Sequence, residues 1–219
     1  SAQVVLESAY IQLCAHMGHS KSKEMARCLT HPPLSAVLYL APSARRFSSD
    51  LPAPQADCVR VVCISDTHNV HSDLRLPKGD VLLHAGDCLT ESGQRYVDRQ
   101  HGQIRAVKPE GVELFEGFAK WFAAQDFPVK VLVAGNHDLV LQGLGREEVR
   151  RILKVCTQQG CTAPVYLEHE EVDIAGFRIF GTPFAHYGGQ NDAFLSRSVN
   201  FEDIPDGVHV VVTHMPCLL

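Results

Sequence analysis

The chain has 219 residues, of which 45% are hydrophobic and 21% are charged, and its formal net charge is −5. This length suffices for one domain with a full core and is marginal for two. The negative net charge excludes the globally basic surface of many nucleic-acid binders. No apolar run approaches the roughly 20 residues that span a bilayer. We therefore expect neither a nucleic acid nor a membrane as a partner.

The first 57 residues differ in composition from the rest. Five prolines interrupt any long helix in this region, and basic residues slightly outnumber acidic ones. The Arg- and Ser-rich stretch 44–49 is typical of organelle transit peptides. We predict a disordered leader or linker over residues 1–57 and a single domain over residues 58–219. The expected location is the cytoplasm, unless the leader directs the protein to an organelle.

Eight cysteines are scattered along the chain, and none forms a C-x-x-C pair. A zinc ribbon is therefore not expected. We interpret the cysteines as free thiols of a reducing compartment, because disulfide frameworks belong to oxidising ones.

From residue 58 onward, short apolar runs alternate with helical patterns. The runs are apolar on both faces and predict buried strands at residues 59–65, 80–85, 129–134 and 208–213. Apolar side chains at helical spacing predict one helix that begins near Pro109 and a second over residues 146–159, stopped by Gly160. Residues 171–184 predict an antiparallel hairpin that turns at Ala175-Gly176. This order of elements predicts a layered α/β fold with a mixed sheet.

Each of the four predicted strands is followed at once by residues that bind hard metal ions. Sites in α/β sheets gather at the carboxyl ends of strands, where the loops converge on one edge. Carboxylate, amide and imidazole groups suit Mn, Fe, Zn or Mg, and a shared carboxylate can hold two ions about 3.5–4 Å apart. The sequence therefore predicts two divalent ions, and the ligands that we expect to meet are Asp66, His68, Asp87, Asn136 and His214.

Four segments around these ligands resemble the metallophosphoesterase superfamily, also called calcineurin-like phosphoesterases. They are ISDTHN, LLHAGDCLTE, VLVAGNHD and VVVTHMP. Together with FRIFGTPF they are most similar to the branch of metallophosphoesterase domain-containing proteins. The resemblance covers residues 58–219 and implies an α/β fold, a four-layer α/β/β/α sandwich with two mixed β-sheets.

The resemblance also implies a role for each ligand. Asp66 and His68 would bind the first metal ion, Asp87 would bridge both ions, and Asn136 and His214 would bind the second.

The expected general acid is His137. The family often places an acidic residue three positions after the bridging aspartate, but Thr90 stands there in this chain. The resemblance therefore leaves Asp138 or Glu91 to orient His137, and we count His137 and Asp138 as the catalytic pair.

The function that the resemblance implies is two-metal phosphoester hydrolysis with a metal-activated water as nucleophile. It favours a small phosphodiester as substrate, with a cyclic nucleotide as one candidate, and no obligate protein partner. One alternative is a phosphomonoesterase that acts on a nucleotide or a phosphoprotein. A second is an inactive module that binds a metal or a nucleotide.

The inactive alternative is supported by a departure from the family pattern. The family's Gly-His-x-His block follows downstream of the last ligand and is absent before Leu219. We therefore expect a fold that is incomplete at its C-terminus. In such a fold the strand at 208–213 would expose an unpaired edge.

Two further histidines have open roles. His84 lies within a predicted strand and is interpreted as a core residue or as support for the ligands. His186 follows the predicted hairpin and is either an ordinary loop residue or part of the substrate pocket.

Overall fold

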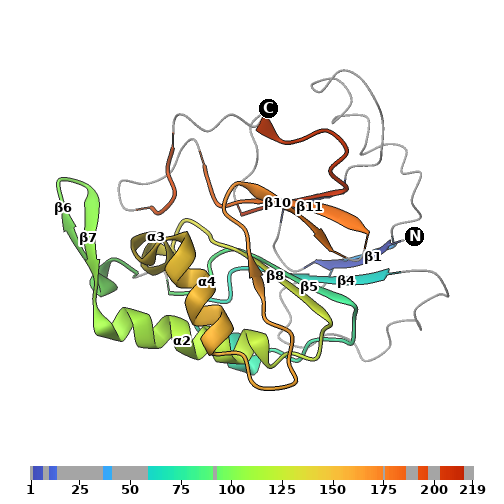
Figure 1. Ribbon diagram of the computed structural model, residues 1–219, viewed down its shortest axis with the longest axis horizontal. Coiled ribbons are helices and arrows are strands. Elements are labelled where there is room, and N and C mark those ends of the chain that lie inside the picture. Colours follow the sequence, from blue (N-terminus) through green and yellow to red (C-terminus); the bar gives the residue numbers. More distant parts are fainter. Residues whose placement is uncertain are drawn as a thin grey trace.

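The computed structural model describes residues 2–6, 10–13, 37–40, 59–90, 93–174, 176–185, 192–196 and 203–214. Figure 1 shows two sheets packed face to face, with helices α2 and α4 on the outer face of the larger sheet. The prediction of an α/β fold is confirmed.

The larger sheet has six strands, and every described pair in it is parallel. Its order is β3 (Val37–Leu40), β1 (Ala2–Leu6), β4 (Val59–Ile64), β5 (Val81–Ala85), β8 (Val129–Val133) and β9 (Val165–Tyr166). β4, β5 and β8 are the predicted apolar runs, and they are buried on both faces as parallel strands usually are.

Two helices bury their apolar faces on this sheet. α2 (Pro109–Ala123) has a proline in its first turn and buries Phe115, Phe118 and Phe122 completely. α4 (Arg146–Val155) ends four residues before the predicted position, and just beyond it the Thr157 hydroxyl donates a hydrogen bond to the Leu153 carbonyl at 2.7 Å. A short helix, α3 (Leu139–Leu144), follows β8 and was not predicted. None of the described helices has the length and apolar character needed to cross a bilayer.

The smaller sheet has four strands in mixed directions. Its order is β10 (Glu170–Ile174), β11 (Phe177–Thr182), β12 (Val210–Thr213) and β2 (Tyr10–Leu13). β10 and β11 form the predicted antiparallel hairpin, and β11 runs parallel to β12. The two sheets share an apolar core that includes Cys63 and Val133 from one sheet and Ile179 and Val212 from the other. The expected mixed pattern therefore holds for the smaller sheet, whereas the described larger sheet is parallel.

Three strands come from the region that was predicted to be a disordered leader. Val4 of β1 lies opposite Val61 of β4, and Tyr10 of β2 lies opposite Thr213 of β12. The described parts of β1, β2 and β3 are strands, and the leader or linker over residues 1–57 as a whole stays a prediction. The described β12 pairs with β11 on one side and β2 on the other, in place of the expected unpaired edge. These runs are only four or five residues long, and only sheet pairing supplies partners for their backbone groups. The boundary at residue 57 stays a prediction.

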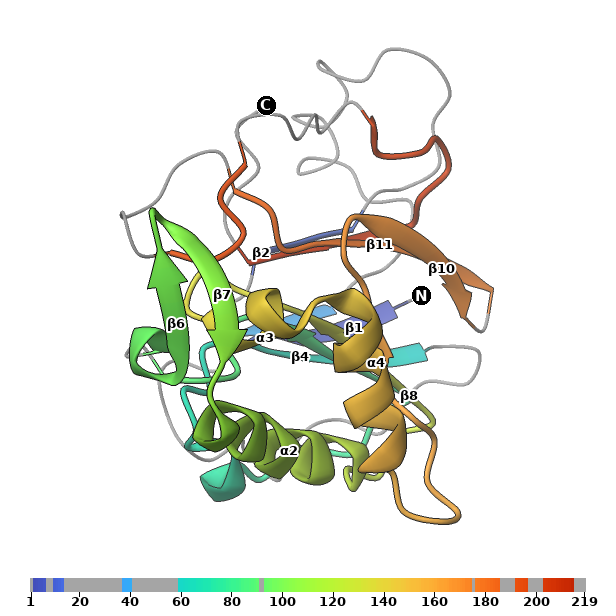
Figure 2. The same cartoon turned by 60° about the vertical axis from the view of Figure 1, so that its left-hand side comes forward.

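A small hairpin stands apart from both sheets. It consists of a 3-10 turn, η2 (Gly93–Tyr96), and of β6 (Val97–Gln100) and β7 (Gln103–Val107). Figure 2 shows it rising beside α3, clear of the sheets. The sequence did not predict it, since only Val97 of its side chains is fully buried in the core.

Candidate metal centre

Four strand ends meet at one edge of the molecule. β4, β5 and β8 are parallel neighbours, so the loops after them leave the larger sheet on the same side. β12 of the smaller sheet ends at the same place, because Nδ1 of His214, which follows it, lies 2.9 Å from the carbonyl oxygen of Ala85 at the end of β5.

The five predicted ligands come together at this edge. Asp66, Asp87 and His214 each offer one ligand atom, and these three atoms all lie within 4.8 Å of one another. His68 Nε2 lies 3.9 Å from Asp66 Oδ1 and 3.9 Å from Asp87 Oδ2. Asn136 Oδ1 lies 2.9 Å from His214 Nε2. These groups form a candidate metal-binding cluster with Asp87 at its centre.

The two histidines present the same ring nitrogen to the cluster. His68 Nδ1 faces the Leu89 carbonyl at 2.9 Å, and His214 Nδ1 faces the Ala85 carbonyl at 2.9 Å. A carbonyl oxygen only accepts hydrogen bonds, so each Nδ1 carries a proton and donates it. Each Nε2 is left to face the carboxylates, which is the orientation that metal-binding histidines adopt in proteins.

Charge in the cluster centres on Asp87, whose side chain is almost completely buried. Burial alone would raise its pKa, but the hydrogen bond and charge of His214 together with the His137 backbone N–H lower it. Burial would lower the pKa of His214, but the hydrogen bond and charge of Asp87 outweigh it and raise that pKa to about 9. The metal-free site therefore holds an ionised Asp87 that attracts positive charge.

The backbone of the ligand loops is strained. Asp66, His68, Asn69 and Asp87 have φ angles of 53°, 38°, 66° and 54°, a left-handed conformation that residues other than glycine rarely adopt. Backbone hydrogen bonds hold it: the Asp66 N–H donates to Gly86 at 2.9 Å and the His68 N–H donates to Asp87 at 3.1 Å. Such strain persists where the surrounding structure enforces it, and it clusters at functional sites.

Two glycines leave room for the ligands. Gly86 has a φ of 99°, and an added Cβ would lie 2.7 Å from the His214 ring. A Cβ on Gly135 would overlap the backbone nitrogen and Oδ1 of Asp87. The positive φ of Gly86 allows the backbone to turn sharply directly before Asp87. Gly135 has no positive φ. A glycine is needed at this position because the loop that carries Asp87 approaches its backbone closely.

Asp138, which was predicted to orient His137, makes its described contacts elsewhere. Its carboxylate is fully buried and accepts hydrogen bonds from the backbone N–H groups of Gly135, Cys88 and Leu89 at 2.7, 3.3 and 3.0 Å. Burial and the charge of Asp87 raise its pKa to about 6. With both oxygens engaged by these donors, the side chain joins the loop after β8 to the loop after β5 and does not orient His137.

His137 lies at the open side of the cluster. Its Nε2 is 3.8 Å from Asp87 Oδ2, its ring stands edge-on to that of His68 at 5.5 Å, and 32% of its side chain is exposed. Its backbone N–H donates to Asp87 Oδ1 at 2.9 Å. The side chain can therefore reach a bound molecule while its backbone is fixed to the central ligand. Glu91 and His186 lie outside the described residues.

His84 supports the loop that carries Asp66 and His68. It is fully buried, and its ring packs edge-on against Phe118 and Phe122. Its Nε2 lies 3.0 Å from the hydroxyl of Thr67, which in turn donates to the Cys88 carbonyl at 3.3 Å. Burial lowers the pKa of His84 to about 3, so the ring is neutral. The interpretation of His84 as a core residue that supports the ligands is confirmed.

Two supporting contacts were missed at the sequence level. The first is the contact of the Thr67 hydroxyl with His84. Thr67 stands between Asp66 and His68, and its position inside this motif was the signal that could have identified it. The Ala193 N–H donates to the Asn136 carbonyl at 2.7 Å, so a distant segment holds the third ligand loop. Nothing in the local sequence around Ala193 indicated this contact.

Fold and site together define an α/β protein with a candidate metal centre at the carboxyl ends of its strands. Residues 59–218 match the family model described as calcineurin-like phosphoesterase. The chain therefore belongs to the calcineurin-like phosphoesterase family.

Several curated sequences are similar to the chain. Human metallophosphoesterase domain-containing protein 1 is 30% identical over 198 residues, which cover 77% of this chain and 52% of the relative. A UPF0046 protein of Caenorhabditis elegans is 29% identical over 178 residues, 73% of this chain and 52% of the relative. The probable rhamnogalacturonate lyase C of Emericella nidulans is 33% identical over 171 residues, 72% of this chain but 14% of that protein. The chain thus spans about half the length of the first two relatives.

Proposed function

We propose that this chain hydrolyses phosphodiesters with two divalent metal ions held by Asp66, His68, Asp87, Asn136 and His214. The observation that carries this proposal is the meeting of three ligand atoms, from Asp66, Asp87 and His214, within 4.8 Å of one another. These residues come from loops after three different strands, and packing has brought their charged and polar groups together at one edge.

The donor set fits hard or borderline divalent ions. Two carboxylates, an amide oxygen and two imidazoles suit Mn, Fe, Zn or Mg. His214 Nε2 faces Asn136 Oδ1 at 2.9 Å and Asp87 Oδ2 at 3.3 Å, so a cation can replace the proton that this nitrogen carries in the metal-free protein. The central position of Asp87, beside the Nε2 atoms of both histidines, supports its assignment as the bridging ligand.

The protein's own groups provide position and a proton. Bound divalent ions would supply charge neutralisation at the phosphoryl oxygens and a more acidic water as nucleophile. His137, exposed beside the cluster, donates a proton to the departing oxygen of the ester. Asp138 and His84 hold the ligand loops in place, and such support determines how well the side chains that bind the metal ions are oriented.

The replacement Asp87→Asn tests this proposal. One central carboxylate serves both ions, so we expect the variant to lose metal stoichiometry and turnover together. The measurements are metal content after dialysis and hydrolysis of bis(4-nitrophenyl) phosphate with added Mn²⁺. Asp173→Asn, an exposed change on β10, is the matched control and should behave as the unmodified chain does.

Three outcomes would contradict the proposal. Unchanged turnover in Asp87→Asn would remove this residue from the site. Faster hydrolysis of 4-nitrophenyl phosphate than of the diester would favour the phosphomonoesterase alternative. Stoichiometric uptake of metal without hydrolysis of either ester would favour the binding module.

A further inference from the structure

A cationic hairpin stands beside the candidate metal centre. We call residues 93–108, which comprise η2, β6, β7 and Lys108, the arginine arm. Its charged residues are four cations and one acid: Arg95, Arg99, Arg105, Lys108 and Asp98. The chain as a whole has a net charge of −5, so this positive charge is local.

The arm's single acid does not neutralise its arginines. Asp98 Oδ1 pairs with Lys108 Nζ at 3.7 Å. Within the described part of the chain, no carboxylate forms an ion pair with Arg95, Arg99 or Arg105. Arg99 donates to the Gly102 carbonyl, and the guanidinium of Arg95 lies 4.7 Å from the centre of the Tyr96 ring. Three guanidinium groups therefore lack an anionic partner among these residues.

The base of the arm is fixed to the loop that carries the proposed general acid. Gly93 packs so closely on this loop that an added Cβ would lie 2.6 Å from the His137 carbonyl oxygen. The returning strand is also held at the base, because Val107 pairs with Val97 and packs on α3, where a Cβ at Gly143 would lie 2.6 Å from Val107 Cγ2. Figures 1 and 2 show the arm beside α3, on the side toward which β8 runs. The arm thus flanks the edge at which the ligands meet.

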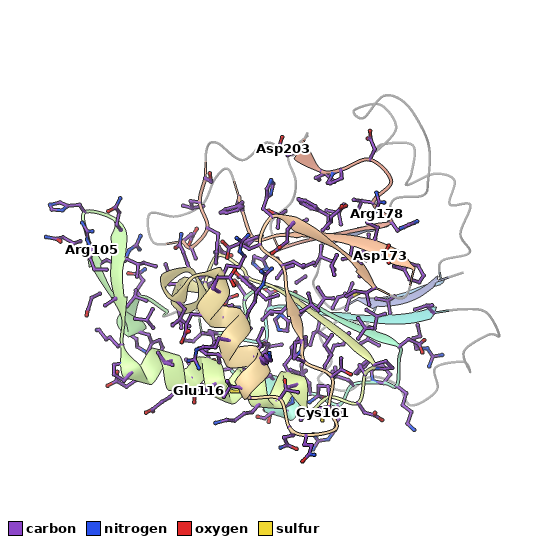
Figure 3. The ribbon with its side chains drawn as sticks, in the orientation of Figure 1. Arg105, Glu116, Cys161, Asp173, Arg178 and Asp203 are labelled. Carbon is purple, nitrogen blue, oxygen red and sulfur yellow. The ribbon has the colours of Figure 1, made fainter. Side chains whose placement is uncertain are left out.

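The hairpin presents one arginine through a break in its pairing. Asp98 lies opposite Ala106, whereas the next residue, Arg99, lies opposite Ile104. Arg105 is therefore the extra residue of a β-bulge, a feature that redirects a side chain and is frequent next to active sites. Figure 3 marks Arg105 on the hairpin, at the margin of the molecule.

The arginines are distributed along the length of the arm. Arg95 lies in η2 at its base, Arg105 lies within β7, and Arg99 lies near the turn. A strand of five residues such as β7 is about 16 Å long at about 3.3 Å per residue. Arg99 and Arg105 lie near each other in the hairpin, because Arg99 pairs with Ile104, whereas Arg95 lies at the base, so a chain of phosphates can make contacts at both places. Guanidinium groups bind phosphates with two parallel hydrogen bonds.

We propose that the arginine arm binds the sugar–phosphate backbone of a single-stranded oligonucleotide whose phosphodiester bond is cleaved at the metal centre. This inference rests on the proposed function and names its substrate class. Single-strand binders follow the phosphate backbone with a cationic track, and the arm supplies such a track in Arg95, Arg99 and Arg105. The expectation of no nucleic-acid partner came from the charge of the whole chain, and the arm is a local exception to it.

Binding of a fluorescein-labelled deoxythymidylate decamer tests the arm without any need for catalysis. The whole 219-residue chain, free of metal, is titrated by fluorescence anisotropy at several salt concentrations. The double variant Arg99→Gln/Arg105→Gln should bind about tenfold more weakly at low salt. The slope of log affinity against log salt should fall by about 1.4, since each neutralised phosphate on a single strand contributes about 0.7. Arg178→Gln is the matched control, because Figure 3 marks Arg178 far from Arg105.

Hydrolysis separates this inference from the proposed function. With Mn²⁺ present, the double variant should lose at least fivefold more kcat/KM on the decamer than on bis(4-nitrophenyl) phosphate. Equal decamer binding by the double variant and the unmodified chain would overturn the arm's role. Tighter binding of a phosphopeptide of the same charge than of the decamer would overturn it too. If the decamer binds through the arm but neither the decamer nor bis(4-nitrophenyl) phosphate is hydrolysed, the binding role of the arm would be supported and the proposed function would be contradicted.

Discussion

Replacing Gly135 by alanine tests how closely the loop after β8 packs on the central ligand. The added Cβ would overlap the backbone nitrogen and Oδ1 of Asp87 and lie 2.9 Å from its Cγ. The Gly135 N–H also donates to Asp138 Oδ2 at 2.7 Å, so the loop cannot retreat without loss of that hydrogen bond. Overpacking of this kind costs roughly 1–3 kcal/mol, and each kcal/mol lowers Tm by about 2–4 °C in a chain of this size. Because Asp87 must shift, we expect metal affinity to fall about 10–100-fold.

The assay for this change compares two alanine variants. Gly117→Ala is the matched control, because Gly117 lies in α2 and nothing stands within 4 Å of its added Cβ. Alanine is favoured over glycine inside a helix by about 0.5–1 kcal/mol, so this control should be slightly more stable than the unmodified chain. Calorimetric titration with Mn²⁺ and thermal unfolding without metal report the two effects separately. An unchanged metal affinity in Gly135→Ala would refute the packing argument.

Three further predictions follow from the same geometry. His137→Ala should lower turnover of diesters with poor leaving groups by about 10²–10⁴-fold and that of good ones far less, and an equal loss on both would exclude general acid catalysis. Asp87 raises the pKa of His214 from 6.5 to about 9, so protonated His214 stabilises the metal-free fold below pH 6.5 and this contribution is lost as pH rises through 9. At about 1.4 kcal/mol per pH unit the loss is up to about 3 kcal/mol, and it should be absent from the thermal unfolding of His214→Gln. Deleting residues 1–13 removes β1 and β2, and we expect Tm to fall because each ladder hydrogen bond contributes about 0.5–1.5 kcal/mol. An unchanged Tm would show that these strands do not support the sheets.

The predicted strands and ligands share a local cause. The runs at 59–65, 80–85 and 129–134 are continuously apolar, so their side chains leave water only when the strand is buried on both faces. The structure places β4, β5 and β8 there. Each ligand follows its strand directly, so the rule that strand ends converge was sufficient to group residues far apart in the chain. The same local logic identified the β10–β11 hairpin from its turn residues.

The shorter elements required tertiary partners. β1, β2 and β3 are runs of only four or five residues, and their pairing depends on sheet edges offered by residues far away in the chain. The β6–β7 hairpin has little apolar alternation, and it is held by η2 and α3 rather than by its own pattern. Sequence periodicity cannot reveal such elements, because their stability comes from the surface that receives them.

The sequence by itself determined the α/β class, the central strands and the five polar residues that gather at their ends. Only the tertiary structure decided the direction and the contacts of the polar side chains beside these five. It turned Asp138 inward to join two loops and left His137 exposed beside Asp87. It also set the arginine arm against the loop of His137 through a contact at Gly93. A sequence pattern specifies which groups are present near a strand end, whereas the direction of each side chain depends on packing against segments remote in the chain.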